Sequence, residues 1–358
     1  MKLGLGLYRD LLTSETLRFA RQAGVTHVVA HLPGQFSRGD DILTSDQAAW
    51  GFGVSQPDDP LWRYEGLRNL KARINAEGLE LEALENFAPA DWYDVLLDGP
   101  RRAEQIAYLQ RVVRDVGRAG IPTIGYNFSL AGVWGRIEGP YARGGARSVG
   151  FQDPIQTLIP VGMVWNMVYD PARFDPERAR GTIGPVGPNE MWRRLAGFLD
   201  QLIPVAEEAG VTLALHPDDP PLPVLRGTAR LVHHPDLFQR VLELRPSRRN
   251  AIEFCVGTVS EMQDADVYAA IDRYSKARQI AYVHLRNVRG KAPNYHETFV
   301  DEGDTDMLRV LAILHRNGYD GVVIPDHTPL LDCRAPWHAG VAYTLGWMRA
   351  AITAVKLR

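Results

Sequence analysis

Residues of types that bind metals stand at the ends of four short apolar runs. The four runs are strand-like in composition and end in His216, Cys255, His284 and Asp326. Two imidazoles, a thiolate and a carboxylate suit a divalent transition metal, and such a set leaves further coordination positions for water or substrate. We therefore predict one metal site formed by these four side chains.

Each of the four residues also has a purely structural explanation. A cysteine at a strand end is most often a small buried hydrophobe, and a lone histidine is most often a hydrogen-bonded polar group. Asp326 can equally cap the turn that follows it. The shared position of all four, at the last residue of consecutive strand-like runs, favours the metal site over these separate explanations.

Polar residues beside the predicted ligands suggest substrate handling and proton transfer. Arg286 and Asn287 follow His284 closely, and an arginine there either forks onto a carboxylate or ties a loop by a salt bridge. His327 and His296 are candidates for acid or base chemistry near neutral pH. Asp218, with its neighbour Asp219, is expected to bind hydroxyl groups or to orient a ligand histidine.

The elements that position these residues are strands alternating with helices. Eight strand-like runs can be counted, each followed by a segment of helical periodicity. They are Leu3 to Leu7, His27 to Leu32, Leu79 to Glu85, Pro122 to Phe128, Thr212 to His216, Ala251 to Cys255, Ile280 to Leu285 and Gly321 to Asp326. This pattern predicts a single (β/α)8 TIM barrel, in which the carboxyl ends of all strands meet at one face.

The positions of glycines independently indicate the same alternation of strands and helices. A glycine stands just before five of these strands and fits the left-handed position that closes a helix: Gly24, Gly78, Gly120, Gly210 and Gly318. An open doubly wound sheet is the alternative fold. It would normally carry a glycine-rich phosphate turn after its first strand, where this chain has Leu7-Tyr8-Arg9-Asp10.

We predict one domain over residues 1–358, with a long insertion after the fourth strand. The insertion runs from Ser129 to Asn189 and is rich in glycine, proline and arginine but also in aromatic residues. A connection of this length is usually functional, so we expect residues 129–189 to form a lid or an oligomer contact. A second loop, Pro33 to Pro60, carries Trp50 and Phe52 and is expected to close over the same face.

The composition limits which classes of partner the protein is expected to bind. Hydrophobic residues make up 45% and charged residues 23% of the chain, which indicates a sizeable core. A net charge of -3 and a pI near 6.4 give no electrostatic signature for nucleic acid or anionic membrane. No run approaches the roughly 18 apolar residues of a membrane span. The two cysteines, Cys255 and Cys333, suit a reducing compartment. We expect a cytoplasmic protein, a homo-oligomer, with a small-molecule partner.

Five motifs resemble, in order and spacing, those of the D-mannonate dehydratases, whose barrel is similar to that of xylose isomerase. They are His216-Pro-Asp-Asp-Pro-Pro221, Phe254-Cys255, His284-Leu-Arg-Asn287, Tyr295-His-Glu-Thr-Phe-Val-Asp-Glu-Gly-Asp304 and Pro325-Asp-His327. The resemblance implies Mn²⁺-dependent conversion of D-mannonate to 2-keto-3-deoxy-D-gluconate. It also implies metal ligation by His216, Cys255, His284 and Asp326, and an acid/base role for His327.

Two positions depart from the family pattern. Ile324 stands where members often have arginine, and Val341 stands near the expected place of a tyrosine that assists catalysis. The nearest tyrosine is Tyr343, which becomes the candidate for the second proton-transfer role. The predicted catalytic group is thus His327, Asp326 and Tyr343, and Arg286, Asn287, His296 and Asp218 are the predicted substrate-binding residues.

Two other functions remain open on the sequence. A metal-dependent sugar isomerase or epimerase of the same barrel type commonly uses two carboxylates as acid and base, and a cysteine ligand is atypical there. A barrel that has lost activity and serves as a binding protein is the non-enzymatic alternative. Metal analysis distinguishes this non-enzymatic alternative from the two enzymes, because only the enzymes are expected to bind stoichiometric metal.

Overall fold

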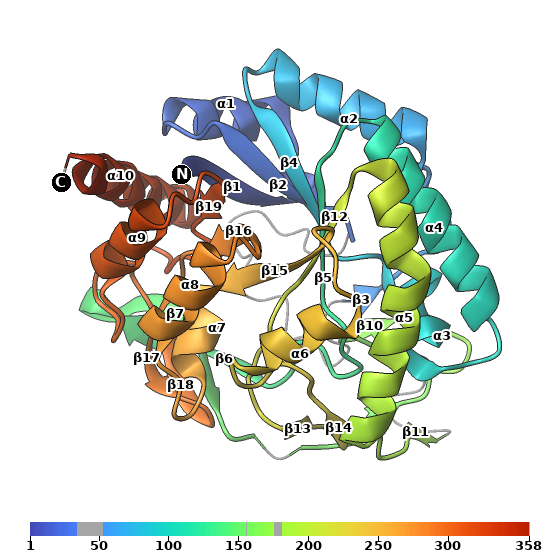
Figure 1. Ribbon diagram of the computed structural model, residues 1–358. Coiled ribbons are helices and arrows are strands. Elements are labelled where there is room, and N and C mark those ends of the chain that lie inside the picture. Colours follow the sequence, from blue (N-terminus) through green and yellow to red (C-terminus); the bar gives the residue numbers. More distant parts are fainter. Residues whose placement is uncertain (34–52, 155, 175–180, 358) are drawn as a thin grey trace.

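Eight parallel strands close into a barrel in the computed structural model, which describes residues 1–33, 53–154, 156–174 and 181–357 (Figure 1). Their order around the ring is β1-β19-β16-β15-β12-β5-β4-β2. The strands are β1 (Lys2–Tyr8), β2 (His27–His31), β4 (Glu80–Glu85), β5 (Thr123–Tyr126), β12 (Thr212–Leu215), β15 (Asn250–Cys255), β16 (Ile280–His284) and β19 (Val322–Ile324). The predicted (β/α)8 barrel is confirmed, and each of the eight predicted runs overlaps one of these strands, although β12 and β19 end before His216 and Asp326.

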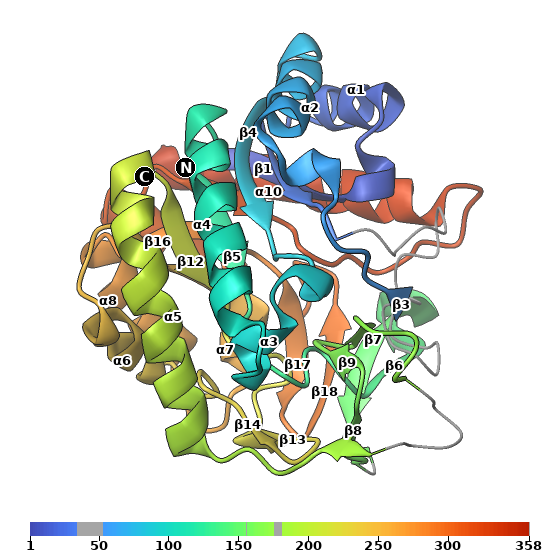
Figure 2. The same ribbon diagram turned by 90° about the vertical axis from the view of Figure 1, so that its right-hand side faces the viewer.

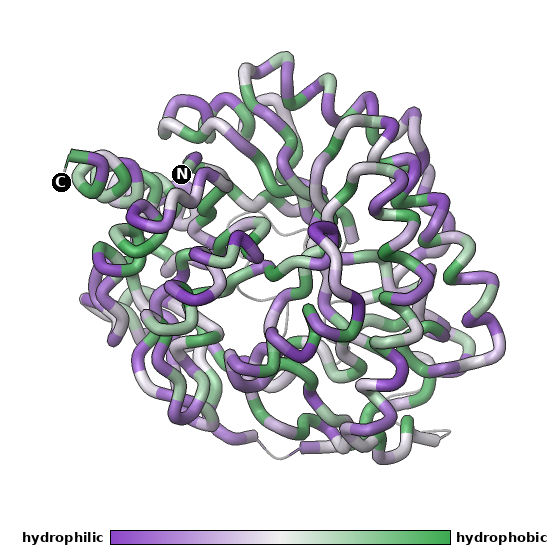
Figure 3. The backbone as a smooth tube through the Cα atoms, in the orientation of Figure 1, coloured by the Kyte–Doolittle hydropathy of each residue, from purple (hydrophilic) through white to green (hydrophobic). Residues whose placement is uncertain are grey.

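Helices follow the strands and surround the ring (Figure 1). They are α1 (Ser14–Gln22), α2 (Tyr64–Ala76), α3 (Tyr93–Leu97), α4 (Arg102–Arg118), α5 (Pro188–Ala209), α6 (Leu237–Leu244), α7 (Val256–Glu261), α8 (Val267–Lys276), α9 (Met307–Arg316) and α10 (Pro336–Lys356). Along the tube in Figure 3, hydrophobic and hydrophilic residues alternate within these helices, as expected when one face packs on the barrel.

Local signals in the sequence explain where several helices begin and end. Thr13 accepts a hydrogen bond from the backbone N–H of Thr16 and so caps α1. The five glycines predicted to close helices all have positive φ, between 69° and 93°. Only glycine adopts this backbone conformation without steric cost, so their role as helix terminators is confirmed.

The barrel interior contains a small apolar cluster with buried polar groups beside it. Side chains from five strands form a small apolar cluster: Val29, Ala83, Ala214, Tyr282, Val322 and Ile324. Close to it lies the buried carboxylate of Glu253, from the middle of β15. A Cβ atom on Gly125 would overlap the Tyr282 hydroxyl and this carboxylate. Glycine in β5 therefore makes room for polar groups inside the ring.

Additional short strands gather at one end of the barrel (Figure 2). A four-stranded sheet has the order β17-β18-β7-β6, built from β17 (Asn287–Lys291), β18 (Asn294–Thr298), β7 (Ala146–Gln152) and β6 (Arg136–Ala142). A small three-stranded sheet has the order β3-β10-β9, from β3 (Gly53–Val54), β10 (Met167–Val168) and β9 (Met163–Val164). Two strand pairs are β8 (Ile159–Pro160) with β11 (Thr182–Ile183), and β13 (Val224–Leu225) with β14 (Thr228–Ala229). The predicted insertion thus pairs, through β7, with the loop that follows β16.

The role of that insertion as lid or oligomer contact stays a prediction. Trp50 and Phe52, which were expected to close over the barrel, lie outside the described residues. Within the described ranges, no helix combines the length and apolar character needed to cross a bilayer.

Candidate metal centre and active site

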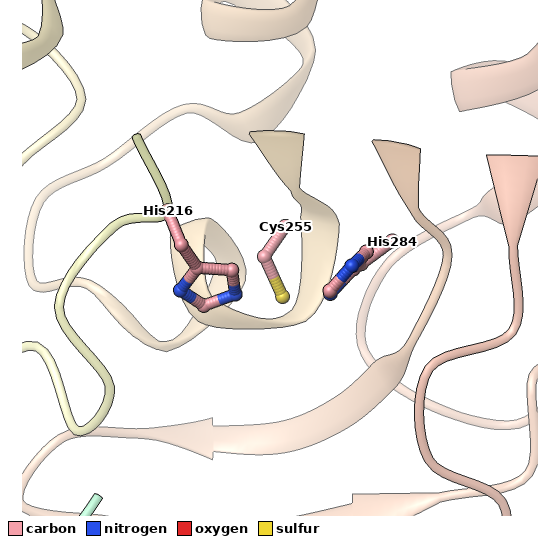
Figure 4. Close-up of side chains that lie close together, drawn as sticks. All are labelled: His216, Cys255 and His284. Carbon is pink, nitrogen blue, oxygen red and sulfur yellow. The ribbon is translucent and has the colours of Figure 1, made fainter. Parts of the chain in front are cut away.

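Three of the predicted metal ligands meet at the carboxyl ends of neighbouring strands. His216 directly follows β12, and Cys255 and His284 are the last residues of β15 and β16. One donor atom from each lies within 4.8 Å of the others. In Figure 4 the cysteine sulfur points between the two imidazole rings. Parallel strands bring residues that are distant in sequence to one place, as the sequence predicted.

Asp326, the fourth predicted ligand, lies at the edge of this group. Its Oδ2 is 3.5 Å from His284 Nδ1 and 3.9 Å from Cys255 Sγ. The residue follows β19 in a left-handed conformation, with φ of 61°. Aspartate tolerates that conformation better than most residues, and the turn directs its carboxylate toward the cluster. Asp326 therefore approaches two of the three other donors.

The surroundings of both histidines favour particular nitrogens as metal ligands. His216 Nδ1 is 2.6 Å from the carbonyl oxygen of Pro217, which requires a proton on Nδ1 and leaves the lone pair on Nε2. His284 Nδ1 faces Asp326, while its Nε2 lies 3.1 Å from Glu253 and 3.5 Å from Glu85. Carboxylates on the far nitrogen of a metal-binding histidine orient the ring and raise its basicity.

Cys255 is buried, and its surroundings favour the thiolate form. Its Sγ accepts a hydrogen bond from the backbone N–H of Thr258 and lies 3.6 Å from Arg286 Nη2. Burial alone would raise the pKa of this thiol. The positive charge of Arg286, together with His216 and His284, outweighs burial and holds the pKa of Cys255 well below its ordinary value. The thiolate is the form that binds metals.

These donors fit a divalent transition metal. Soft thiolate and imidazole ligands suit such ions, and a carboxylate completes a mixed set. A second group of donors within 4.8 Å comprises Glu85, Glu253 and His284, so the same imidazole belongs to both. Burial, together with the charge of Glu85, raises the pKa of Glu253 to about 8, against the opposing effect of His284.

A cavity opens beside the cluster and contains a fifth functional candidate, His327. His216, His284 and Asp326 also line this cavity. His327 Nδ1 lies 2.9 Å from Glu297 Oε1, so the carboxylate accepts a hydrogen bond and fixes the ring. Burial lowers the pKa of His327, but Asp326 and Glu297 outweigh it and raise the pKa above the ordinary value. Glu297 therefore orients the ring, and the raised pKa favours the protonated form of His327.

Arg286, a predicted substrate-binding residue, is not among the side chains that line the cavity. It is 2% exposed. Its guanidinium nitrogens lie within 3.3 Å of four carboxylates: Asp219, Glu261, Glu297 and Asp326. The structural alternative that the sequence left open, an arginine tying loops together by salt bridges, describes these contacts. Arg286 also affects one proposed metal ligand, because its positive charge lowers the pKa of Cys255.

Two other predicted substrate-binding residues are engaged in loop structure. The Asn287 side chain donates to the carbonyl oxygens of Val300 and Thr305 and so holds the loop after β18. Asp218 accepts hydrogen bonds from the backbone N–H groups of residues 231 and 232 and pairs with buried Arg230. Neither residue lines the described cavity.

His296 and Tyr343 likewise lie away from the cavity-lining residues. His296 is half-buried in β18, where its ring packs against Tyr141. Tyr343 is exposed on α10, and its hydroxyl donates to Asp301 and accepts from Arg143. The cavity side of α10 is formed instead by Val341, with Trp337 one turn earlier.

Several cavity and cluster residues were missed by the sequence reasoning. Glu253 precedes Cys255 by two positions, and residues two apart in a strand share a face, so this signal was available. Glu85 ends β4 just as Cys255 ends β15. Arg136 gave no local signal, because its position depends on the pairing of β7 with β18.

A closed barrel of eight parallel strands, with potential metal ligands gathered at their carboxyl ends, places the chain in the class of (β/α)8 TIM barrels. Solved structures agree on this fold. L-ribulose 3-epimerase superposes with a TM-score of 0.58 at 15% identity, covering 99% of this chain and 96% of the other. Mannonate dehydratase from Streptococcus suis serotype 2 superposes with a TM-score of 0.78 at 24% identity, covering 100% of this chain and 94% of the other.

Within that class the sequence identifies one family. The model of the D-mannonate dehydratase (UxuA) family matches residues 1–345, and the chain belongs to this family. Mannonate dehydratase of Streptococcus pneumoniae (strain 70585) is 30% identical over 279 residues, covering 76% of this chain and 75% of the relative. That of Streptococcus uberis (strain ATCC BAA-854 / 0140J) is 27% identical over 316 residues, covering 84% and 90%. The predicted resemblance is confirmed.

Proposed function

We propose that this protein is a hydro-lyase that converts D-mannonate to 2-keto-3-deoxy-D-gluconate with a bound divalent metal. The observation that carries the proposal is the donor cluster of His216, Cys255 and His284, of which His216 and His284 line one cavity together with His327. Membership of the D-mannonate dehydratase family supplies the substrate. The family favours dehydration over the isomerase or epimerase alternative.

The metal would be held by His216, Cys255, His284 and Asp326, and Mn²⁺ is the first candidate. When bound, a divalent cation supplies electrostatic stabilisation of negative charge that develops on substrate oxygens. The chain's own contribution is the prepared donor set. His216 is set by Pro217 to present Nε2, and Cys255 is kept as a thiolate by Arg286.

Dehydration requires two proton movements. A base must take the proton at C2, next to the carboxylate. An acid must protonate the hydroxyl at C3, which then leaves as water. The resulting enol tautomerises to the 2-keto product. We assign His327 to one of these transfers. Its Nδ1–H is occupied by Glu297, so Nε2 is the atom that exchanges a proton. Asp326 Oδ1 lies 3.6 Å from this nitrogen and stabilises the charged ring.

A substrate assay tests the reaction itself. Purified protein reconstituted with Mn²⁺ is expected to form a 2-keto-3-deoxy acid from D-mannonate and to leave D-mannose and D-fructose unchanged. Product is measured by a colorimetric assay for 2-keto-3-deoxy acids and by NMR. Interconversion of the free sugars without dehydration of D-mannonate would overturn the proposal in favour of an isomerase or epimerase.

Removal of Glu253 is expected to weaken metal binding. Glu253 Oε1 lies 3.1 Å from His284 Nε2. Once ionised, above its raised pKa of about 8, this carboxylate favours a proton on Nε2 and leaves Nδ1 for the metal. Loss of such a partner typically lowers metal affinity by about 10- to 100-fold. We expect this effect in Glu253→Leu and a smaller one in Glu253→Gln, measured by Mn²⁺ titration followed by electron paramagnetic resonance. Glu82→Leu, in β4, is the control; equal affinities in all variants contradict the assigned role.

The remaining partner predictions belong to this proposal. We propose a sugar acid as the small-molecule partner, and a cytoplasmic homo-oligomer as the working form. Light scattering of the purified protein measures the latter.

A further inference from the structure

The carboxyl end of the barrel consists of two arcs of neighbouring strands that carry different side chains. The proposed metal ligands stand on or just after β12, β15, β16 and β19, which are adjacent in the ring. The other arc contains β5, β4 and β2, and its strand ends carry a second polar group, here called the polar wall: Asn127, Asn86, Glu85 and His31. All four residues line the same cavity as His216 and His284. A molecule held at the metal ligands therefore faces the polar wall across the barrel end.

A chain of hydrogen bonds joins three members of the polar wall. Asn127 Nδ2 donates to Asn86 Oδ1 at 3.3 Å, and Asn86 Nδ2 lies 3.3 Å from His31 Nε2. Burial lowers the pKa of His31, which favours the neutral ring, and one nitrogen of a neutral imidazole accepts a hydrogen bond. Asn86 is 3% exposed, and both ends of its amide are engaged in this chain. Its contacts therefore orient the Asn127 amide.

The backbone of Asn86 is fixed for this role. Its φ is 62°, in the left-handed region that asparagine enters more readily than most residues. Its N–H donates to the carbonyl oxygen of Gly125 at 2.8 Å, which ties the turn after β4 to β5. Asp326 has nearly the same φ, 61°, in the turn after β19. Each arc thus uses a left-handed turn to direct a polar side chain that lines the cavity.

Asn127 keeps hydrogen-bonding capacity for a ligand. Its amide has a carbonyl oxygen and two N–H donors. Within the part of the chain that the structure describes, this amide makes one hydrogen bond, the donation to Asn86. The side chain is half-buried and lines the cavity, so its oxygen and second N–H are available to a molecule bound there. An acceptor beside a donor matches a hydroxyl group, which both donates and accepts.

The polar wall begins one side chain away from the metal ligands. Glu85 Oε2 lies 3.5 Å from His284 Nε2, and Glu85 Oε1 lies 3.8 Å from His31 Nε2. The proposed substrate is a chain of six carbons that reacts at C2 and C3, next to its carboxylate. Its C4, C5 and C6 carry three further hydroxyl groups. When the reacting end lies at the metal ligands and His327, the cavity brings these hydroxyl groups to the polar wall.

We propose that Asn127 binds hydroxyl groups at C4 to C6 of the substrate and that Asn86 positions the Asn127 amide for this contact. The inference rests on the proposed function, because it assigns a binding role for the unreacting end of the same substrate. The contact makes the cavity selective for six-carbon sugar acids over shorter hydroxy acids. One arc of the barrel end then holds the reacting carbons, and the other arc recognises the length of the chain.

Two ligands of different length test the proposal. D-Gluconate differs from D-mannonate in the configuration at C2. D-Glycerate has the carboxylate and the C2 configuration of D-gluconate but ends at C3. Binding of both to the Mn²⁺-loaded protein is measured by calorimetry, and the unaltered protein is expected to bind D-gluconate more tightly. In Asn127→Leu the affinity for D-gluconate is expected to fall by about 10-fold, with little change for D-glycerate.

Two variants test Asn86 as a positioning residue. Asn86→Gly removes the amide but keeps a residue that adopts the left-handed backbone conformation without strain. It is expected to lower the affinity for D-gluconate by about threefold and to leave that for D-glycerate unchanged. Asn86→Asp keeps an oxygen that accepts the hydrogen bond of Asn127. This conservative variant is expected to retain most of the preference for D-gluconate, which a loss of structure would not allow.

Asn189→Leu is the control, because Asn189 is exposed in the first turn of α5 and does not line the described cavity. It is expected to keep the full preference for D-gluconate. Equal losses for both ligands in Asn127→Leu would indicate a disturbed site and overturn the proposal, as would an unchanged preference. Since the readout is binding, failure of the unaltered protein to dehydrate D-mannonate refutes the proposed reaction separately.

Discussion

Replacing His327 with asparagine is expected to lower kcat for D-mannonate by about 10²- to 10⁴-fold, the usual contribution of a positioned acid or base. The imidazole lines the cavity beside His284 and Asp326, and Glu297 holds its Nδ1–H. Asparagine can accept or donate a hydrogen bond at a similar place, but it cannot take up and release a proton near neutral pH. The loss is therefore expected in kcat more than in KM.

The measurement needs metal content beside activity, since His327 neighbours a proposed ligand. We expect Mn²⁺ binding by His327→Asn to remain within a few-fold of that of the unaltered protein. His296→Asn is the matched control: this histidine lies in β18 against Tyr141 and outside the described cavity lining, so its kcat is expected to be nearly unchanged. Near-full turnover by metal-loaded His327→Asn would remove His327 from the mechanism.

The parts of the site that the sequence predicted are those that depend on local pattern. A strand-like run followed by a helical segment fixes where a barrel strand ends, and the barrel then brings all strand ends to one face. His216, Cys255 and His284 needed nothing more to be placed together. The glycines that close helices were predictable for the same reason, because left-handed backbone conformation is a property of the residue itself.

The parts that the sequence did not predict depend on contacts between distant segments. Arg286 stands two residues beyond a predicted ligand, yet its side chain turns to four carboxylates that belong to separate parts of the chain and is not among the cavity-lining residues. Arg136 reaches the cavity only because β7 pairs with β18. Such contacts carry no signal at short sequence spacing, so the direction of the Arg286 side chain could not be inferred from its neighbours in the sequence, and its substrate-binding role stays a prediction.

Glu253 and Glu297 were partly predictable from the sequence. Glu253 shares a strand face with Cys255, and Glu297 belongs to a recognised motif, so both were visible as residues. The residues that they contact could not be predicted. Glu253 meets His284 across neighbouring strands, and Glu297 meets His327 only because the loop after β16 folds back over the barrel end. The sequence therefore indicates which residues carry the chemistry better than it indicates which residues orient them.

Replacing Cys255 with serine is expected to produce the largest loss of metal. The sulfur is the one soft, negatively charged donor in the cluster, and a serine hydroxyl stays protonated near neutral pH, so the variant offers a neutral oxygen in its place. If the affinity of a four-ligand site is shared among its donors, loss of one costs on the order of 10²- to 10³-fold in affinity. Turnover at limiting Mn²⁺ is expected to fall with it.

Cobalt reports on the sulfur directly. Co²⁺ bound to a thiolate absorbs in the near ultraviolet by charge transfer from sulfur, and this band is expected in the unaltered protein and absent in Cys255→Ser. Cys333→Ser is the matched control, because Cys333 is the other cysteine of the chain and is exposed. The control is expected to keep both the band and the Mn²⁺ affinity. A band that survives in Cys255→Ser, or a metal affinity equal to that of Cys333→Ser, contradicts thiolate ligation at the end of β15. In that case the alternative donors are the carboxylates of Glu85 and Glu253, which share His284 with the proposed site.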